Sequence, residues 1–393
     1  MPWKEQNVME SRQAFIDDYL GARMNISTLC DRYGVSAKTG YKWLKRFKEG
    51  GYSGLADKSK RPYTHSRQLT ETQICNIIRL KKEFMDFGPK KIHNLYSRSH
   101  QPEISLSSVN RILKRSGFTK TYKKRRANPL EHKSIILEAN APNDIWTIDF
   151  KGYWQTKSNN KCEPLTVADQ YSRFILYCFP LAESNGGHIK EVLTVLFKRY
   201  GLPKVIKSDN GPPFSHPLTP RGISSLSNWL MSLDIDIHRI EPAKPYQNGK
   251  HERMHRDLKA LVQIGPRLSM KEYHESLKMF QKKYNTQRPH ESLNMKFPSE
   301  IYIKSDRKYH EPSKDVDYPK DMFIRRVYKS GEIKYESARY KISQTLAGYQ
   351  LGLKYEKDDL AVYFCDILLG YIKVELKLFK PLKAALQLPV NEV

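Results

Sequence analysis

Three acidic residues stand in local contexts that could bring their carboxylates to one site. Asp149 lies inside the apolar run WTIDF (146–150), and Asp209 follows the short run VIKS (205–208). Glu252 opens a segment with helical spacing. A buried, charged aspartate without compensation is costly, and ligands of α/β sheets bind at the edge beyond the strand ends. These contexts therefore favour a functional role for the three acids.

The segment 249–263 predicts a helix with two different faces. At about 100° per residue, Arg256 and Lys259 share the side of Glu252, and the apolar residues fall on the opposite side. An ordinary Glu–Arg pair on a solvated surface is the plain alternative. The two unusual aspartates elsewhere in the chain favour a site instead. The apolar residues are Met254, Leu258 and Leu261.

Convergent carboxylates suit the breakage of a phosphodiester. In-line attack needs charge stabilised on the nucleophilic and leaving oxygens, which two Mg²⁺ ions about 3.5–4 Å apart can do. Mg²⁺ prefers hard oxygen ligands and usually takes one or two carboxylates. Asp149, Asp209 and Glu252 are therefore the expected catalytic and metal-binding residues, for two ions per site. We expect Mg²⁺ as the cofactor, with Mn²⁺ as a substitute.

Two other acids compete for these roles. Glu241 is the rival of Glu252, but no cationic helix face accompanies it. Asp169 is the rival of Asp149, and its position just before Tyr171 and Arg173 favours the orientation of a turn. A supporting role beside the metal site stays open for Asp169.

The charge of the chain predicts a polyanionic partner. It has 393 residues, with 68 Lys plus Arg against 42 Asp plus Glu, a formal net charge of +26. Nucleic acid is the commonest polyanion for such a protein, and a basic solvated surface without a partner is the alternative. The stretch from Arg111 to Arg126 has eight basic residues and no acidic one.

Residues 1–52 predict a first helix-turn-helix DNA-binding domain. Three short helices are expected, and Ser36 caps the third. Tyr41, Leu44 and Phe47 are placed on its inner side, and Gly40 is expected to permit close approach to DNA. A small helical bundle with a solvated face is the alternative. The outward, DNA-contacting positions are Lys38, Thr39, Lys42, Lys45 and Arg46.

A second helix-turn-helix DNA-binding domain is predicted at residues 69–128, behind a linker at residues 53–68. Ser105 caps its last helix, and a basic connector follows. The expected DNA-contacting residues are Arg111, Lys114, Arg115, Lys123, Lys124, Arg125 and Arg126.

Residues 138–305 and 320–380 predict two further domains. The first alternates strand-like and helical runs, which indicates an α/β layer fold. The second alternates strand-like runs with glycine-centred turns, which indicates a small β-barrel with a hairpin turn at Lys329-Ser330-Gly331.

Several protein classes are disfavoured. The five cysteines are scattered without a CxxC or Cys/His cluster, so neither a zinc site nor a disulfide framework is indicated. The first residues do not resemble a signal peptide, and no run approaches eighteen apolar residues. We expect a cytoplasmic protein associated with the bacterial nucleoid.

Five motifs resemble, in order, the transposases of bacterial insertion sequences that share the retroviral-integrase core. The resemblance also covers both helix-turn-helix segments and reaches the carboxy-terminal strands. The motifs are NDIWTIDF (143–150), VADQYSRF (167–174), YGLPKVIKSDNGPPF (200–214), PYQNGKHERMHRDLK (245–259) and YNTQRPHESL (284–293).

The resemblance implies a ribonuclease-H-like catalytic core with an acidic DDE triad. Asp149 would lie on the first strand, Asp209 after the fourth, and Glu252 on the following helix. Arg256 and Lys259 match positions that face the element-end DNA, and Asn248 matches the mobile loop before the acid. The chain departs from many members in its longer interval, because 42 residues separate Asp209 from Glu252. The surplus lies around residues 215–225, which are expected to form a loop.

The leading hypothesis is a transposase that binds double-stranded DNA at element ends, cleaves it and joins 3′ ends to target DNA. Two ends must be brought together, so a homodimer or larger complex on DNA is expected. A DNA-binding repressor without catalysis is the runner-up, and a metal nuclease without joining activity is a third possibility.

Overall fold

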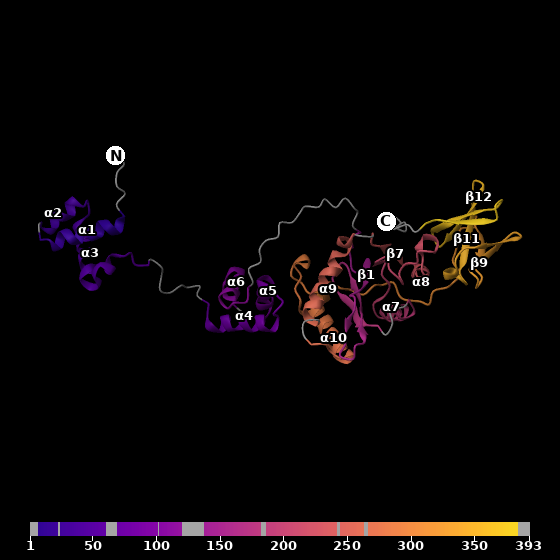
Figure 1. The fold of residues 1–393 in the computed structure, drawn as a ribbon, viewed down its shortest axis with the longest axis horizontal. Helices are drawn as coiled ribbons and strands as arrows, with labels where there is room; N and C mark the ends of the chain where they lie inside the picture. The colour runs from indigo at the N-terminus through magenta and orange to yellow at the C-terminus, as the bar shows by residue number, and fades with distance from the viewer. Residues whose placement is uncertain are drawn as a thin grey trace. The chain divides into compact units, whose positions relative to one another are not determined.

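The computed structural model describes residues 7–22, 24–59, 69–100, 102–119, 137–181, 186–241, 244–262 and 266–383. The chain divides into two compact units, Met1–Gln73 and Ile74–Val393, and each is described by itself (Figure 1). In these ranges, no helix has both the length and the apolar character needed to cross a membrane. The predicted connector residues Lys123, Lys124, Arg125 and Arg126 lie outside the described residues.

The first unit is a three-helix bundle. Side chains of Asn7, Asn25 and Ser36 accept backbone N–H bonds at the three helix starts, which satisfies groups that a helix leaves unpaired. Phe15 and Leu29 are among the buried residues that form the shared core. The elements are α1 (Val8–Leu20), α2 (Ile26–Arg32), α3 (Ala37–Gly50) and the 3₁₀ turn η1 (Gly51–Leu55).

Two sequence expectations for α3 are wrong. Tyr41 is 58% exposed, and Trp43 with Leu44 takes the inner side instead. Gly40 faces the bundle and not a ligand, since a Cβ there would lie 2.4 Å from Cys30 Sγ. The glycine therefore allows α3 to pack closely against α2.

The second unit begins within another helical group. It contains α4 (Glu71–Glu83), α5 (Pro89–Ser99) and α6 (Leu106–Arg115). Ser105 caps α6 as expected, by accepting a bond from Ser108 N–H. Ile77, Ile92, Val109 and Leu113 are fully buried, so one apolar face of each helix forms a common core.

A five-stranded mixed sheet carries the rest of the unit. Its order is β5-β4-β1-β6-β7. β1 pairs antiparallel with β4 and parallel with β6, and β6 pairs parallel with β7. The predicted turn at Asp169 does separate β4 from β5. The strands are β1 (Ile145–Phe150), β4 (Pro164–Asp169), β5 (Ile175–Pro180), β6 (Val205–Ser208) and β7 (Asp236–Arg239), with a small ribbon of β2 (Trp154–Gln155) and β3 (Lys161–Cys162).

Helices cover both faces of this sheet. Trp146 and Ile148 of β1 share a core with α7 and α8, while Ile175 and Cys178 of β5 share another with α9 and α10. Because neighbouring residues of a strand point to opposite faces, Thr147 and Asp149 belong to the α9 side. The helices are α7 (Gly186–Tyr200), α8 (Ser225–Met231), α9 (Gly249–Val262), α10 (Met270–Gln287) and α11 (Pro298–Ile301), with 3₁₀ turns η2 (Pro220–Gly222), η3 (Pro245–Asn248) and η4 (Glu291–Leu293).

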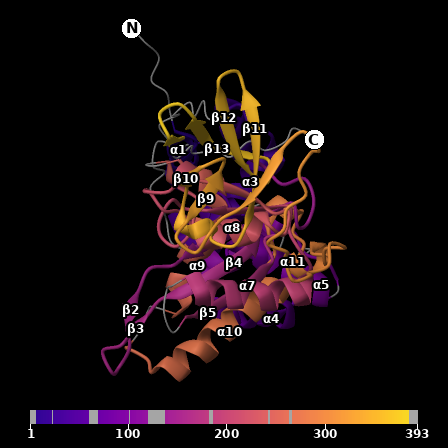
Figure 2. The ribbon, with the colours of Figure 1, turned by 90° about the vertical axis from the view of Figure 1, so that its right-hand side faces the viewer.

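The carboxy-terminal strands form open sheets, so the predicted small β-barrel is not confirmed. One sheet has the order β14-β13-β12-β11-β8, and β9 pairs with β10 separately; β11, β12 and β13 are seen together in Figure 2. The expected turn at Lys329-Ser330-Gly331 is present, since Gly331 N–H donates to the carbonyl of Tyr328 and Tyr328 N–H donates to that of Glu332, both over 2.8 Å. The strands on either side, β8 and β9, form their ladders with β11 and β10. The elements are β8 (Phe323–Arg326), β9 (Glu332–Tyr335), β10 (Ala338–Lys341), η5 (Gln344–Leu346), β11 (Gln350–Glu356), β12 (Asp359–Phe364), β13 (Ile367–Lys373) and β14 (Leu378–Pro381).

The long interval after Asp209 folds as an ordered insertion before α8. Ser215 pairs with Ile223 as an isolated bridge. The guanidinium of Arg239, only 2% exposed, donates to the carbonyl of Arg221 over 2.9 Å. Arg221 in turn donates to the carbonyls of Leu368 and Leu382, both over 3.0 Å. The insertion thus joins the core to the carboxy-terminal sheet.

Ion pairs attach the α4–α6 group to the other end of the core. Arg98 of α5 makes a two-bond pair with Glu300, at 2.7 and 3.1 Å. Arg288 lies between two acids, 2.8 Å from Asp86 and 2.6 Å from Asp257. Asp257 belongs to α9, so Arg288 links the helical group to the helix that carries Glu252.

Replacement of Arg288 by Ala is expected to loosen this attachment. Its side chain is 11% exposed, so removal leaves two acids without their cation, at a cost of about 3 kcal/mol in the free energy of unfolding. Lys90→Ala is the matched control, because the Lys90–Glu291 pair is exposed on both sides and such pairs contribute about 1 kcal/mol or less.

Denaturant unfolding and hydrogen exchange of residues 84–91 measure the two effects. A loss from Arg288→Ala no larger than that from Lys90→Ala would show that the attachment does not depend on Arg288.

Candidate functional site

Asp149 and Asp209 lie at the same edge of the sheet. β1 and β6 are adjacent and parallel, so their carboxyl ends point the same way. Asp149 is near the end of β1, and Asp209 follows the last residue of β6 directly. The Asp149 side chain is 25% exposed. Two aspartates thus reach solvent at the ends of strands that are otherwise mostly buried.

Glu252 belongs to the first turn of α9. The helix buries Met254 and Leu258 and leaves Glu252, Arg256 and Lys259 exposed. This is the division of faces that the helical spacing predicts; the side chain of Leu261 lies outside the described residues.

The pKa of Asp149 responds to the charges of both Asp209 and Glu252. Its pKa is raised to about 7, first by burial and then by the charge of Asp209; the N–H of Phe150 opposes this rise, and Glu252 adds to it. Burial also raises the pKa of Asp209. Carboxylates that are close together and partly buried are stabilised when one of them takes a proton or when a cation binds between them. The edge is therefore built for a positive ligand.

A buried hydroxyl connects Asp149 to two histidines. Thr166 Oγ1 on β4 donates to the carbonyl oxygen of Asp149 over 2.9 Å. Thr166 Oγ1 also lies 2.7 Å from the Nε2 atoms of His251 and His255. His251 Nδ1 lies 2.7 Å from the hydroxyl of Thr147. One hydroxyl thus ties β1 and β4 to α9 directly behind the acidic edge.

Both imidazoles are neutral at pH 7. Burial lowers the pKa of His251 to about 3, and burial with the nearby His251 lowers that of His255 to about 2. Neutral rings can serve as hydrogen-bond partners here without adding charge. Their i, i+4 spacing places both rings on one face of α9, and this spacing is the signal in the sequence that could have indicated the pair.

The residues at this edge fit a hard divalent cation. Ligand atoms of Asp149, His251 and His255 lie within 4.8 Å of one another, the spacing of a mixed nitrogen–oxygen metal site. However, both ring nitrogens of His251 already have hydroxyl partners, while His255 Nδ1 faces Asp149 Oδ2 at 3.9 Å. The oxygens of Asp149, Asp209 and Glu252 face solvent and suit Mg²⁺ better. The histidines therefore support the edge from behind.

The two rival acids are engaged elsewhere. The Asp169 carboxylate accepts bonds from Ser172 N–H and hydroxyl at 2.7 and 2.6 Å, and from Asn143 N–H at 2.8 Å. It fixes the turn before β5, as its sequence context predicts. Glu241 pairs with Lys244 and with the side-chain amide of Gln247.

The predicted DNA-contacting residues fall into separate groups. On α3, Lys38, Lys42 and Lys45 are exposed, and Thr39 and Arg46 are half-buried. Lys42 and Arg46 also lie over the ring of Trp43. On α6, Arg111, Lys114 and Arg115 are exposed. Asn248 is buried and donates to Asp149 Oδ2 over 3.4 Å, so it supports the acidic edge.

Comparison with protein families identifies domains in both units. Residues 139–245 and 233–298 match two models that are described as integrase core domains. Residues 11–63 match a helix-turn-helix domain, and residues 39–113 match a homeodomain-like domain.

The chain is similar to proteins of mobile elements. It is 23% identical over 238 residues to an uncharacterized 31.7 kDa protein of insertion element IS407 from Burkholderia multivorans, covering 60% of this chain and 82% of that protein. It is 23% identical over 197 residues to a 39.2 kDa protein of insertion element IS476 from Xanthomonas euvesicatoria, covering 49% of this chain and 54% of that protein. A 33% identical stretch of 125 residues covers 30% of this chain but only 6% of the Gag-Pol polyprotein of baboon endogenous virus.

Solved structures of retroviral proteins also align with the chain. One is the HTLV-2 integrase catalytic core domain in complex with magnesium, which is 18% identical and covers 42% of this chain and 100% of that chain, with a TM-score of 0.34. Another is the simian T-cell lymphotropic virus intasome, which is 17% identical and covers 72% of this chain and 91% of that chain, with a TM-score of 0.37.

The raised pKa of Asp149 predicts a pH-dependent stability of the metal-free protein. The folded value of about 7 lies above the ordinary value of 3.8, so the folded state holds this proton more tightly than the unfolded state. Stability is therefore fully present below pH 4 and falls as pH rises to about 7. Urea unfolding in EDTA should show this fall, and Asp149→Asn should lack that part of it. Equal pH slopes for both proteins would contradict the raised pKa.

Loss of the Thr166 hydroxyl is expected to weaken metal binding. In Thr166→Val the two imidazoles and the Asp149 carbonyl lose their shared partner, and loss of such supporting bonds costs about tenfold to a hundredfold in metal affinity. The rise of melting temperature with Mg²⁺ or Mn²⁺ concentration measures this affinity. Thr166→Ser retains the hydroxyl and is expected to bind nearly as the natural protein does. Equal affinity for the Val and Ser variants would show that the network does not position Asp149.

Proposed function

Because the chain carries an integrase core domain and helix-turn-helix domains, we propose that it is a DNA transposase of the DDE type. It would bind the ends of an insertion sequence, cleave phosphodiesters there and join the 3′ ends to target DNA. The observation that supports this proposal is that Asp149 and Asp209 lie at the carboxyl ends of two adjacent parallel strands, where the charges of Asp209 and Glu252 both act on Asp149.

The proposed chemistry needs these acids to act together. When bound, two Mg²⁺ ions would stabilise charge on the nucleophilic and leaving oxygens. Asp149 and Asp209 would bind these ions from the ends of β1 and β6, and Glu252 would bind them from α9. Thr166 fixes the carbonyl of Asp149, and Asn248 bonds its side chain. Because Asp149 is held by both bonds, little reorganisation is needed when substrate arrives.

DNA is the partner that the rest of the chain favours. Helix-turn-helix domains place their last helix in the major groove, and exposed cations on α3 and α6 suit contacts with phosphates. Arg256 and Lys259 stand on the same exposed face of α9 as Glu252, where they would hold the end DNA beside the acids. Two ends must meet for joining, so we propose a homo-oligomer, at least a dimer, on DNA.

Substitution of each acid is expected to abolish Mg²⁺-dependent cleavage while end binding stays intact. The variants are Asp149→Asn, Asp209→Asn and Glu252→Gln, and each removes one charged ligand without a change of shape. Cleavage of labelled duplex ends measures the first effect, and fluorescence anisotropy measures binding. Glu275→Gln is the matched control, because Glu275 is an exposed acid on α10.

Retention of natural cleavage by any of the three variants would remove that residue from the triad. A natural protein that binds ends but never cleaves them would be the repressor. A protein that cleaves but does not join pre-cut 3′ ends to target DNA would be the plain nuclease.

A further inference from the structure

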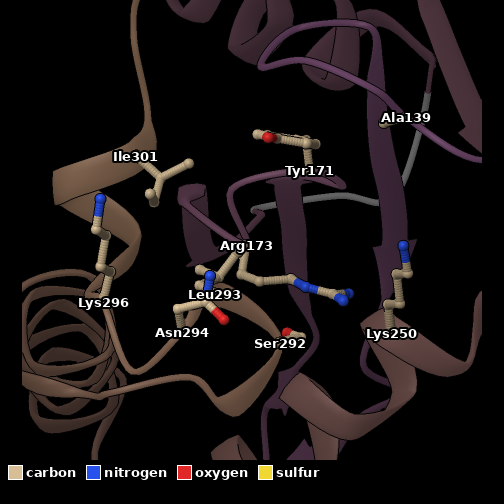
Figure 3. A pocket seen from close by; sticks show the side chains of 9 residues that line it. All are labelled: Ala139, Tyr171, Arg173, Lys250, Ser292, Leu293, Asn294, Lys296 and Ile301. Carbon is tan, nitrogen blue, oxygen red and sulfur yellow. The ribbon is translucent and has the colours of Figure 1, made fainter.

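A cavity beside the start of α9 is separate from the acidic edge. Its volume is about 360 Å³. Four segments line it: the chain before β1 at Ala139, the turn between β4 and β5, the first turn of α9, and the chain that follows α10 (Figure 3). Lys250 of α9 points into it from the side opposite Glu252, because the two residues are about 200° apart around the helix. The lining residues used below are Tyr171, Arg173, Lys250, Asn294 and Lys296.

The charge of the cavity is positive. Arg173, Lys250 and Lys296 line it, and no acid does. Figure 3 shows the guanidinium of Arg173 extending toward the side on which Lys250 stands. Among the described residues, neither side chain has an ion pair or a hydrogen bond. Glu138 is the one described acid whose charge reaches both.

The fold fixes Arg173 in this place. Its backbone is left-handed, with φ of 65°, and its N–H donates to the carbonyl of Asp169 over 3.0 Å. The Asp169 carboxylate holds Ser172 through two bonds. A left-handed arginine is unfavourable without such support. The turn therefore fixes the backbone position from which the Arg173 side chain extends into the cavity.

The cavity also communicates with the network behind Asp149. A second, much smaller cavity shares Arg173 and Lys250 and is lined further by Thr147 and His251. His251 contacts Thr166, which bonds Asp149. A ligand on Arg173 and Lys250 would thus lie one layer of side chains from the acidic edge.

A phosphate group matches this chemistry. The planar guanidinium can bind two phosphate oxygens at once, and the lysine adds a point charge. The hydroxyl of Tyr171 and the amide of Asn294 add hydrogen-bond donors at the rim. We propose that this cavity binds a phosphate of the DNA backbone, so that the strand is held on the far side of α9 from the acids. The choice of DNA as the source rests on the proposed function; the phosphate chemistry does not.

The first experiment measures duplex binding without metal. Lys250→Gln and Arg173→Asn remove the two cations, and Asn tolerates the left-handed backbone at position 173. Fluorescence anisotropy is recorded in EDTA over a range of NaCl concentrations. The double variant is expected to bind about tenfold more weakly, and the slope of log K against log salt should fall by about one to two.

The double variant Lys278→Gln with Lys282→Gln is the control, since both lysines are exposed on α10 and their joint loss removes the same two positive charges. An equal loss in this control, or natural affinity and slope in the double variant, overturns the proposal. Natural cleavage together with such a negative result would leave the proposed function standing, so the two failures are distinguishable.

The second experiment identifies the source of the phosphate. Acylation of Lys250 is followed by mass spectrometry with no addition, with millimolar pyrophosphate, or with duplex DNA. Protection by duplex alone supports the backbone phosphate. Equal protection by pyrophosphate supports the phosphate site but overturns DNA as its necessary source. No protection by either overturns the site.

Discussion

Asp149 and Asp209 carry like charges at the carboxyl ends of two adjacent parallel strands, and the surrounding structure has to hold them there against their repulsion. The pKa of Asp149 rises to about 7 because of burial and the charge of Asp209. A flexible edge would let the acids move apart. Parallel pairing of β1 with β6 prevents this, and the Thr166 hydroxyl of β4 ties α9 to β1. Because the acids cannot move apart, their repulsion persists until a bound cation relieves it.

Much of the site could be predicted from the sequence because it depends on local patterns. The strand around Asp149, the turn at Asp169 and the exposed face of α9 each follow from periodicity within one segment. Glu252, Arg256 and Lys259 stand on one face because a helix repeats every 3.6 residues. Such inferences need no knowledge of what packs against the segment. The α/β layer character of residues 138–305 followed in the same way, from the alternation of strand-like and helical runs.

The errors concern contacts between segments that are distant in the chain. Tyr41 is placed on the inner side by its spacing with Leu44 and Phe47, but the buried face of α3 runs through Gly40, Trp43 and Leu44 and leaves Tyr41 exposed. Gly40 makes sense only once Cys30 is placed beside it. His251 and His255 gain meaning from Thr166, 85 and 89 residues away. The open carboxy-terminal sheets depend on which strands pair, and turn residues such as Gly331 do not decide this.

The insertion after Asp209 limits how freely the parts of this protein could be exchanged. Arg239 holds the carbonyl of Arg221, and Arg221 reaches the carbonyls of two carboxy-terminal residues. A relative with fewer residues between the second aspartate and the glutamate would lack these contacts. If the carboxy-terminal sheet of that relative were grafted onto the present core, it would have no surface complementary to the insertion. Recombination between relatives should therefore transfer residues 215–223 together with the carboxy-terminal sheet, although about 100 residues of sequence separate them from its first strand.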